Sequence, residues 1–468
     1  MRKVVTRRGS PARIFLATGI AVCVGGAAFA DEDIDKNGIP KSSLAHSLPL
    51  HGDAGRTRAD LAARGITYGW TYTGEVFGNA SGGVRRETVI EGRFDAHLQA
   101  DLEKLLGAKG LTFYVSGSQI HATGGIRRDS VVPTFATLSN IEALPSTRLF
   151  ELWFEQKFAN DKIALRFGQL AVDSEFLISS YSSLFFTSGW PAITGTDLPS
   201  GGPAWPLATP GIRLKVEPDK NWALLLGLFN GDPAGPGMDD PQGRDRSGTA
   251  FRVNDPPLLI GEMQYNYNQD TNAKGLAGTI KLGAWHHFGT FDSQRFDTGG
   301  LSLANPASNG MPARLSGNDG IYAGIDQQIY RPAKGDADSG IGLFARISAS
   351  PSDRNIVSFY ADGGIVFSGM IPGRPDDKFG ATFLYSRISD SARALDFDRI
   401  AFGNGPRPVR DREMILELSY QAQIVPGWTV QPDFQYVMHP GGHAPDPMVP
   451  SMAIKDAAIF GLRTTIKY

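Results

Sequence analysis

Residues 93–102 read RFDAHLQADL, and polar and apolar side chains alternate along this whole stretch. One face carries Phe94, Ala96, Leu98, Ala100 and Leu102, and the other carries Arg93, Asp95, His97, Gln99 and Asp101. A repeat of two residues is the repeat of a β-strand, whose successive side chains point to opposite faces. The same alternation recurs at 150–158, 262–268, 413–421 and 460–468. The chain is therefore expected to consist mainly of strands with one apolar and one polar face.

The number, length and connections of these strands distinguish a membrane barrel from a soluble β-sandwich, which shows the same alternation. About sixteen strands are expected, near residues 66–77, 93–103, 110–121, 148–158, 162–171, 210–217, 221–230, 259–269, 277–289, 320–330, 341–350, 355–366, 378–388, 411–422, 427–438 and 456–468. Many approach the ~9–11 residues that a tilted strand needs to cross a bilayer. Connections largely alternate in length: those at 121–148, 171–210, 230–259 and 289–320 are long, and those at 158–162 and 217–221 are tight. One exception is the connection at 350–355, which falls on the side of the long connections but is short. This asymmetry predicts an all-β, antiparallel transmembrane barrel with long external loops. The last strand alternates and ends on Tyr468, which suits a barrel in which the last strand pairs with the first.

The composition excludes several other classes of protein. The chain has 468 residues, of which 56 are glycine and one is cysteine, so a helical bundle, a coiled coil and a disulfide-stapled scaffold do not fit. Lysine and arginine number 46 against 48 aspartate and glutamate, which leaves no basic excess for binding nucleic acid. Beyond the first thirty residues, no apolar run approaches the ~20 residues of a membrane-spanning helix.

The first thirty residues are expected to be a cleaved secretory signal peptide. A basic start precedes an apolar stretch at 14–29, and Ala28-Phe29-Ala30 has the small-x-small pattern of a cleavage site. The apolar stretch is short for an uncleaved membrane anchor. Residues 31–65 are expected to form a periplasmic lead with a short helix over Arg56–Ala63, and residues 66–468 the barrel. The protein would then be exported through the periplasm and inserted into the cell outer membrane.

Sixteen strands imply a pore, because about eight strands are filled by their own side chains whereas 16–18 leave an aqueous channel. The longest connection, 171–210, is rich in apolar and aromatic residues, so it is expected to fold into the lumen and narrow it. There it would present Asp173, Glu175, Trp190 and Trp205. Candidates that point inward from neighbouring strands are Arg93, His97, Glu151, Trp153, Glu155, Arg166 and Arg213.

These residue types suit a path for sugars, which have apolar C–H faces and hydroxyl edges. Acidic Asp173 and Glu175 would accept hydrogen bonds from hydroxyl groups. The donors would be Arg93, Arg166 and Arg213, and the stacking rings would be Trp153, Trp190 or Trp205. The presence of both signs favours a neutral solute over an ion selected by a ring of one charge. Each candidate could instead be an ordinary residue of the wetted wall.

Several separated stretches share a pattern that covers most of the chain in order. They are SNIEA (139–143), RLFELWFEQ (148–156), RFGQ (166–169), DSEF (173–176), GWP (189–191), PSGGP (199–203), PLATPGIR (206–213), DQQ (326–328), LFAR (343–346), PSD (351–353), PGRPDD (372–377) and QPDFQY (431–436). In these stretches the chain resembles the carbohydrate-selective porins of Gram-negative outer membranes, the OprB type. The resemblance implies a sixteen-stranded barrel that passes glucose and related sugars by diffusion, a short periplasmic N-terminal segment, and a monomer. One departure is FFTS at 185–188, where the family pattern leads us to expect an asparagine-containing stretch.

Three other functions are alternatives to the sugar porin. A general or weakly ion-selective porin would share the barrel and differ only in the lining of its constriction. A secreted all-β glycoside hydrolase could use Glu151 and Glu155, but residues four apart on one strand lie ~13 Å apart, beyond the usual ~5–9.5 Å between paired carboxylates. A plugged transporter of ~22 strands needs a longer chain. The expected partners are small neutral sugars and outer-membrane lipids, and no nucleic acid, metal or cofactor is expected. A monomer is favoured, and a trimer is the alternative.

Overall fold

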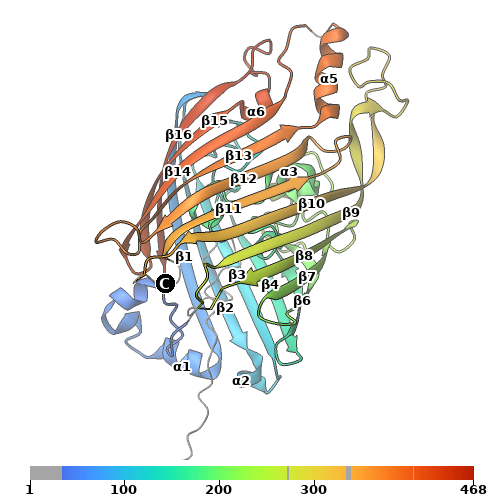
Figure 1. The fold of residues 1–468 in the computed structure, drawn as a ribbon. Helices are drawn as coiled ribbons and strands as arrows, with labels where there is room; N and C mark the ends of the chain where they lie inside the picture. Colours follow the sequence, from blue (N-terminus) through green and yellow to red (C-terminus); the bar gives the residue numbers. More distant parts are fainter. Residues whose placement is uncertain (1–33, 271–272, 334–338, 404) are drawn as a thin grey trace, which may run out of the picture.

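The computed structural model describes residues 34–270, 273–333, 339–403 and 405–468. The predicted signal peptide lies outside these residues. Sixteen strands form one closed antiparallel barrel in which each strand pairs with its neighbours in the sequence and β1 pairs with β16 (Figure 1). Among the described residues, no helix is both long and apolar enough to span a membrane.

The predicted strands are all found, most of them within a few residues of the expected bounds. They are β1 (Ile66–Gly83), β2 (Thr88–Asp101), β3 (Leu111–Ala122), β4 (Ser146–Phe158), β5 (Ile163–Leu170), β6 (Thr209–Val216), β7 (Trp222–Asn230), β8 (Pro257–Tyr267), β9 (Gly278–Asp297), β10 (Pro312–Tyr330), β11 (Gly340–Ala349), β12 (Val357–Ser368), β13 (Lys378–Ile388), β14 (Arg412–Val425), β15 (Trp428–Met438) and β16 (Lys455–Lys467). The prediction of an all-β antiparallel barrel is therefore confirmed.

The two ends of the barrel differ, as the connection lengths predicted. The turn end carries the C-terminus, α1 (Thr57–Arg64) and α2 (Leu102–Leu106). The loop end carries α5 (Asp390–Ala401) and α6 (Pro440–His443) (Figure 1). The remaining helical pieces are η1 (Leu44–Ser47), η2 (Pro49–Gly52), η3 (Val172–Ser174), η4 (Ser182–Leu184), α3 (Ala192–Asp197), η5 (Pro199–Gly201) and α4 (Pro241–Arg244).

The N-terminal segment is fastened to the turn end by a buried arginine. Arg58, in the helix expected at 56–63, lies 5.0 Å from the ring centroid of Tyr68 and 5.1 Å from that of Tyr468. Its Nε donates to the carbonyl oxygen of Gly38 at 3.1 Å. The helix ends at Gly65 because this residue takes a φ of 97°, which glycine adopts without steric cost.

One expectation about the loop end is corrected by the structure. The connection expected at 289–320 is shorter than predicted, because β9 and β10 extend past the barrel as a long hairpin and leave only residues 298–311 between them. The apolar alternation fades in this extension, which bears ion pairs such as Arg314 Nη1 with Asp292 Oδ1 at 2.5 Å. The short connection at 350–355 also lies at the loop end, where Ile356 N donates to Asp197 Oδ1 of α3 at 2.8 Å.

Candidate functional site

Residues 171–208, between β5 and β6, fold into the barrel as the sequence predicted, and we call this segment the inward loop. Its apolar residues pack against an apolar part of the inner wall. The packed cluster includes Val172, Phe176, Leu177 and Leu198 of the loop and Trp153, Leu225, Ile260 and Trp285 of the wall. This packing explains why β7 has apolar residues on both faces: Leu224, Leu226 and Leu228 are exposed, while Leu225 is buried against the loop.

Three acidic residues of the barrel wall hold residues 177–187, which we call the far part of the inward loop, in place across the lumen. Each accepts hydrogen bonds from backbone N–H groups of the loop. The bonds are Leu177 N to Glu262 Oε2 (2.9 Å), Ser180 N to Asp326 Oδ2 (3.0 Å), Phe186 N to Glu417 Oε1 (2.6 Å) and Thr187 N to Glu417 Oε2 (3.1 Å). An irregular buried backbone must find partners for its polar groups, and bonds to carboxylates are among the stronger ones. These contacts join the loop to β8, β10 and β14.

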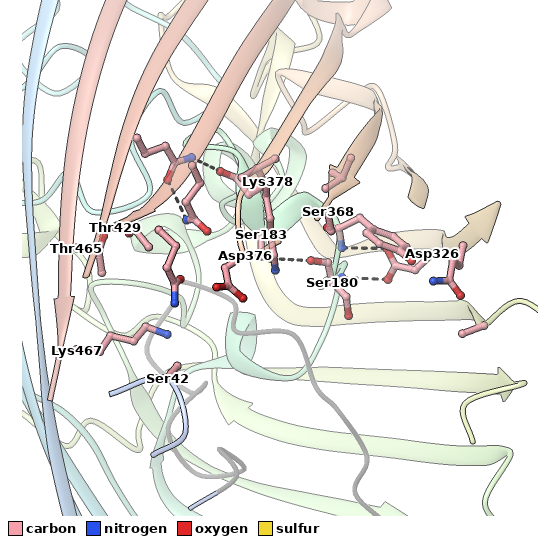
Figure 2. A pocket seen from close by; sticks show the side chains of 18 of the residues that line it. Ser42, Ser180, Ser183, Asp326, Ser368, Asp376, Lys378, Thr429, Thr465 and Lys467 are labelled. Carbon is pink, nitrogen blue, oxygen red and sulfur yellow. Dashed lines mark hydrogen bonds between the residues drawn. The ribbon is translucent and has the colours of Figure 1, made fainter. Parts of the chain in front are cut away.

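The inward loop separates two cavities of the lumen. The turn-end cavity has a volume of about 360 Å³ and is lined largely by hydroxyl, amide and charged groups, which include Ser180, Ser183, Asp326, Ser368, Lys378, Thr429 and Lys467 (Figure 2). The loop-end cavity has a volume of about 190 Å³ and is lined by groups that include Arg127, Asn140, Glu142, Asp173, Ser183, Trp190, Trp205 and Arg346. Ser183 lines both cavities, so the turn around it lies at the boundary between them.

Of the eleven predicted site residues, three line the loop-end cavity: Asp173, Trp190 and Trp205. Asp173 Oδ2 accepts a hydrogen bond from Trp205 N at 3.0 Å. The guanidinium carbon of Arg93, another predicted residue, lies 4.2 Å from the ring centroid of Trp205. Arg93 also pairs with Asp95 at 2.6 Å. An aromatic plate, an acceptor and a cation thus lie together beside this cavity.

Four of the predicted residues form a closed ion-pair cluster at the base of the inward loop. Arg213 lies 2.8 Å from Glu155 and 2.7 Å from Glu175, and Arg166 lies 2.9 Å from Glu155 and 3.7 Å from Glu175. Burial by itself would raise the pKa of the Glu175 carboxyl, but the guanidinium groups of Arg166 and Arg213 lower it to about 2. These residues line neither of the two cavities. Their two positive and two negative charges join the loop to β4, β5 and β6.

The other three predicted residues also line neither cavity. Trp153 is buried, with its ring stacked on Tyr114 at 4.7 Å between centroids and the guanidinium carbon of Arg166 3.9 Å from its own ring centroid. His97 stacks on Tyr114 at 6.0 Å between centroids. Glu151 Oε1 accepts a hydrogen bond from Ala171 N, the first residue of the loop, at 3.2 Å.

Sequence reasoning missed the residues at the boundary between the cavities. Ser180 and Ser183 belong to the serine-rich stretch SSYSS at 179–183, a compositional signal that was available in the sequence. Asp326 occupies an inward position of β10, which period-two alternation marks as polar but cannot distinguish from other inward positions.

Replacing Asp173 with asparagine should change the stability of the protein in a pH-dependent way. Burial raises the pKa of Asp173 from 3.8 to about 6. Its protonated form therefore contributes stability that is complete below pH 3.8 and lost as the pH rises through about 6. Asp173→Asn, which stays neutral, should have a higher unfolding temperature than the parent protein at pH 7.5 and nearly the same one at pH 3.5. An equal difference at both pH values would contradict this assignment.

Comparisons with known proteins agree with this architecture. The family model described as "Carbohydrate-selective porin, OprB family" matches residues 86–468. The chain is 24% identical over 449 residues to Porin B of Pseudomonas aeruginosa, with 90% of this chain and 91% of that protein covered. It is 20% identical over 416 residues to the putative porin QuiX of Acinetobacter baylyi, with 84% of this chain and 89% of that protein covered.

A solved structure supports the fold. The high-pH structure of Pseudomonas putida OprB superposes with a TM-score of 0.74 at 20% identity and covers 90% of this chain and 98% of that one. The match over residues 86–468 includes fifteen of the sixteen strands from β2 onward and the whole inward loop. The chain therefore belongs to the carbohydrate-selective porin, OprB family, and is a sugar-selective porin of the Gram-negative outer membrane.

Proposed function

We propose that neutral sugars cross this barrel by passive diffusion, without chemical turnover, through a constriction at Ser180 and Ser183. The main support for this proposal is that Ser183 lines both cavities. It lies on a loop whose backbone is hydrogen-bonded to side chains of three strands. A solute that passes between the cavities would pass this turn. Serine hydroxyls both donate and accept, so they can exchange hydrogen bonds with sugar hydroxyls in either sense.

The loop-end cavity would receive the sugar first, because the long loops of an outer-membrane barrel lie on its external side. There Trp190 and Trp205 would offer plates for the C–H faces of the ring. Two of the arginines that line this cavity have partners of opposite sign. Arg346 pairs with Asp362, and Nη2 of Arg128 lies 3.4 Å from Oδ1 of Asp129. Charges that are already compensated favour neutral solutes over ions.

The experiment is single-channel conductance of the refolded mature protein in a planar bilayer, titrated with glucose, a disaccharide and an uncharged polymer of similar size. Block by glucose at millimolar concentration, without block by the polymer, would support a sugar site in the constriction. Openings that are indifferent to glucose would contradict it and would leave a general or weakly ion-selective pore in the same barrel.

Enlarging residue 183 should narrow the pore in proportion to its size. Ser183→Ala should leave the conductance near that of the parent protein, Ser183→Leu should lower it, and Ser183→Phe should lower glucose flux by about tenfold, because a pore selects by its narrowest diameter. Glucose flux is measured by the swelling of liposomes that hold the assembled protein. If all three variants conduct alike, the constriction lies elsewhere.

Two further expectations concern the mature chain. We infer cleavage after Ala30, which N-terminal sequencing of the exported protein would test. We also infer that a single chain makes a complete pore, since β1 and β16 close the barrel without a second copy. Light scattering in detergent would separate a monomer from a trimer.

A further inference from the structure

Two histidines and an aspartate come together at the loop end, away from the inward loop. Asp411 directly precedes β14, and His439 and His443 lie at the two ends of the turn that contains α6, between β15 and β16 (Figure 1). Oδ1 of Asp411 lies 3.1 Å from Nδ1 of His439 and 4.0 Å from Nδ1 of His443. In the part of the chain that the structure describes, this is the one group of three such side chains whose potential ligand atoms all lie within 4.8 Å of one another.

These separations suit a small metal ion. Zinc binds imidazole nitrogen and carboxylate oxygen at ~2.0–2.2 Å in a tetrahedron, which places neighbouring ligand atoms ~3.3–3.5 Å apart. The two distances from Asp411 Oδ1 fall on either side of that value. The two imidazole rings are stacked, with centroids 4.3 Å apart and planes 15° from parallel. The distances, rather than the stacking, show that Nδ1 is the nitrogen of each ring that faces Asp411 Oδ1.

The backbone holds the two histidines in this arrangement. His439 and His443 have φ values of 52° and 72°, in the left-handed region that side chains other than glycine rarely adopt. The turn is fixed by His439 N to Asp456 Oδ1 (2.9 Å), Gly441 N to Glu413 Oε2 (2.9 Å) and Asp411 N to Gly442 O (2.9 Å). A residue kept in an unfavourable conformation by its surroundings is a sign of a functional constraint.

The site is open to solvent and its charges are mixed. The side chains of Asp411, His439 and His443 are 25%, 27% and 37% exposed, so an ion can enter from the external side. Arg412 pairs with Oδ2 of Asp411 at 3.1 Å. Oδ1 accepts a hydrogen bond from the backbone N of Arg412 at 2.6 Å and also faces the imidazoles. Asp456, which bonds to the backbone of His439, adds negative charge next to the site.

We propose that Asp411, His439 and His443 bind a divalent transition-metal ion of the Zn²⁺ type, with solvent in the remaining position. Imidazole ligands suit zinc, copper and nickel rather than calcium or magnesium. The bound ion ties the connection between β13 and β14 to the connection between β15 and β16. It thereby stiffens the external mouth of the pore, independently of the sugar path.

The test is a titration of the refolded mature protein, without a polyhistidine tag, with Zn²⁺ in a calorimeter and with Co²⁺ followed by absorption spectroscopy. The parent protein should bind one Zn²⁺ per chain, show the visible bands of tetrahedral Co²⁺, and unfold at a higher temperature when Zn²⁺ is present. Removing a ligand in His443→Asn or Asp411→Asn should weaken Zn²⁺ binding by more than about tenfold, since even residues outside the ligand set change affinity by that much.

A matched control is His286→Asn. His286 Nδ1 pairs with Asp319 Oδ1 at 2.5 Å near the same end of the barrel, but among the described residues this pair has no third ligand close enough to complete a site. The control should keep the affinity and the Co²⁺ bands of the parent protein. Equal Zn²⁺ affinity in the parent protein and in a His439→Asn, His443→Asn double variant would overturn the proposal. So would the absence of Zn²⁺ binding to a parent protein that has assembled, as shown by its heat-modifiable mobility on a gel.

Discussion

A double replacement of Asp326 and Glu417 by alanine is expected to open the pore. These two carboxylates accept the N–H groups of Ser180, Phe186 and Thr187, and thereby hold the far part of the inward loop on β10 and β14. Without them, these three N–H groups and the hydroxyls of Ser179 and Thr187 lose their carboxylate partners. Each hydrogen bond to a charged group contributes about 1.5–3 kcal/mol. The loop should leave the wall, because water in the lumen can solvate the freed groups. Single-channel conductance should rise by about twofold or more, and block by glucose should be lost, since an unobstructed sixteen-stranded barrel is an aqueous channel.

The matched control for this variant is Glu413→Ala. Glu413 also lies on β14 and accepts backbone N–H groups, but from Phe135, Ala136 and Gly441, which belong to other loops. Its loss should leave the inward loop in place and the block by glucose intact. Unchanged conductance in an assembled Asp326→Ala, Glu417→Ala protein would show that apolar packing alone keeps the loop across the lumen.

A second large effect is expected from Arg213→Met, which should destabilise the barrel by about 3–5 kcal/mol because it leaves a buried carboxylate without its full complement of positive charge. Arg213 is 1% exposed and pairs with both Glu155 and Glu175. Once it is removed, Arg166 must compensate two carboxylates alone. Urea unfolding of the protein in lipid vesicles, followed by tryptophan fluorescence, measures the loss.

The charge argument predicts a rescue and a pH dependence. Adding Glu175→Gln to Arg213→Met restores a neutral cluster and should recover much of the stability. In the parent protein the ionised Glu175 contributes stability that is present above pH 4.5 and is lost as the pH falls toward about 2. The difference between the parent protein and Arg213→Met should therefore shrink when unfolding is measured at pH 3. If the double variant is no more stable than the single one, packing of the arginine rather than its charge is what matters.

Local sequence patterns were sufficient for most of the barrel, because each strand has a period of two residues. They failed where the two-residue alternation was absent and where the chain forms a helix instead of a strand. The ends of β9 and β10 extend beyond the membrane region, where no apolar face is required, and so lacked the signal. The helix α5 was not expected, although Ser389 caps it by accepting Ala392 N at 3.2 Å and Asp390 lies in its first turn. Its signal was present in a stretch that strand counting treats as a loop.

The candidate site was likewise predicted only in part from the sequence. Alternation and composition indicated that Arg93, Glu155, Arg166 and Arg213 point inward and that the segment 171–210 enters the lumen. They could not show that Glu155, Arg166, Glu175 and Arg213 pair with one another, while Asp173, Trp190 and Trp205 line a cavity. Whether an inward charge meets water or another charge depends on which strands are neighbours across the lumen and on where the loop lies.

The sequence by itself determined the strand repeat, the asymmetry of the connections and the length of the inward loop, and these establish a sixteen-stranded barrel with a narrowed lumen. Each of these properties follows from residues close together in the chain. Only the tertiary structure decided that Asp326 and Glu417 hold the loop, that Ser183 lies at the boundary between the cavities, and that Asp411, His439 and His443 meet at the external mouth. Those contacts join residues up to about 230 positions apart, and closure of the barrel brings them together.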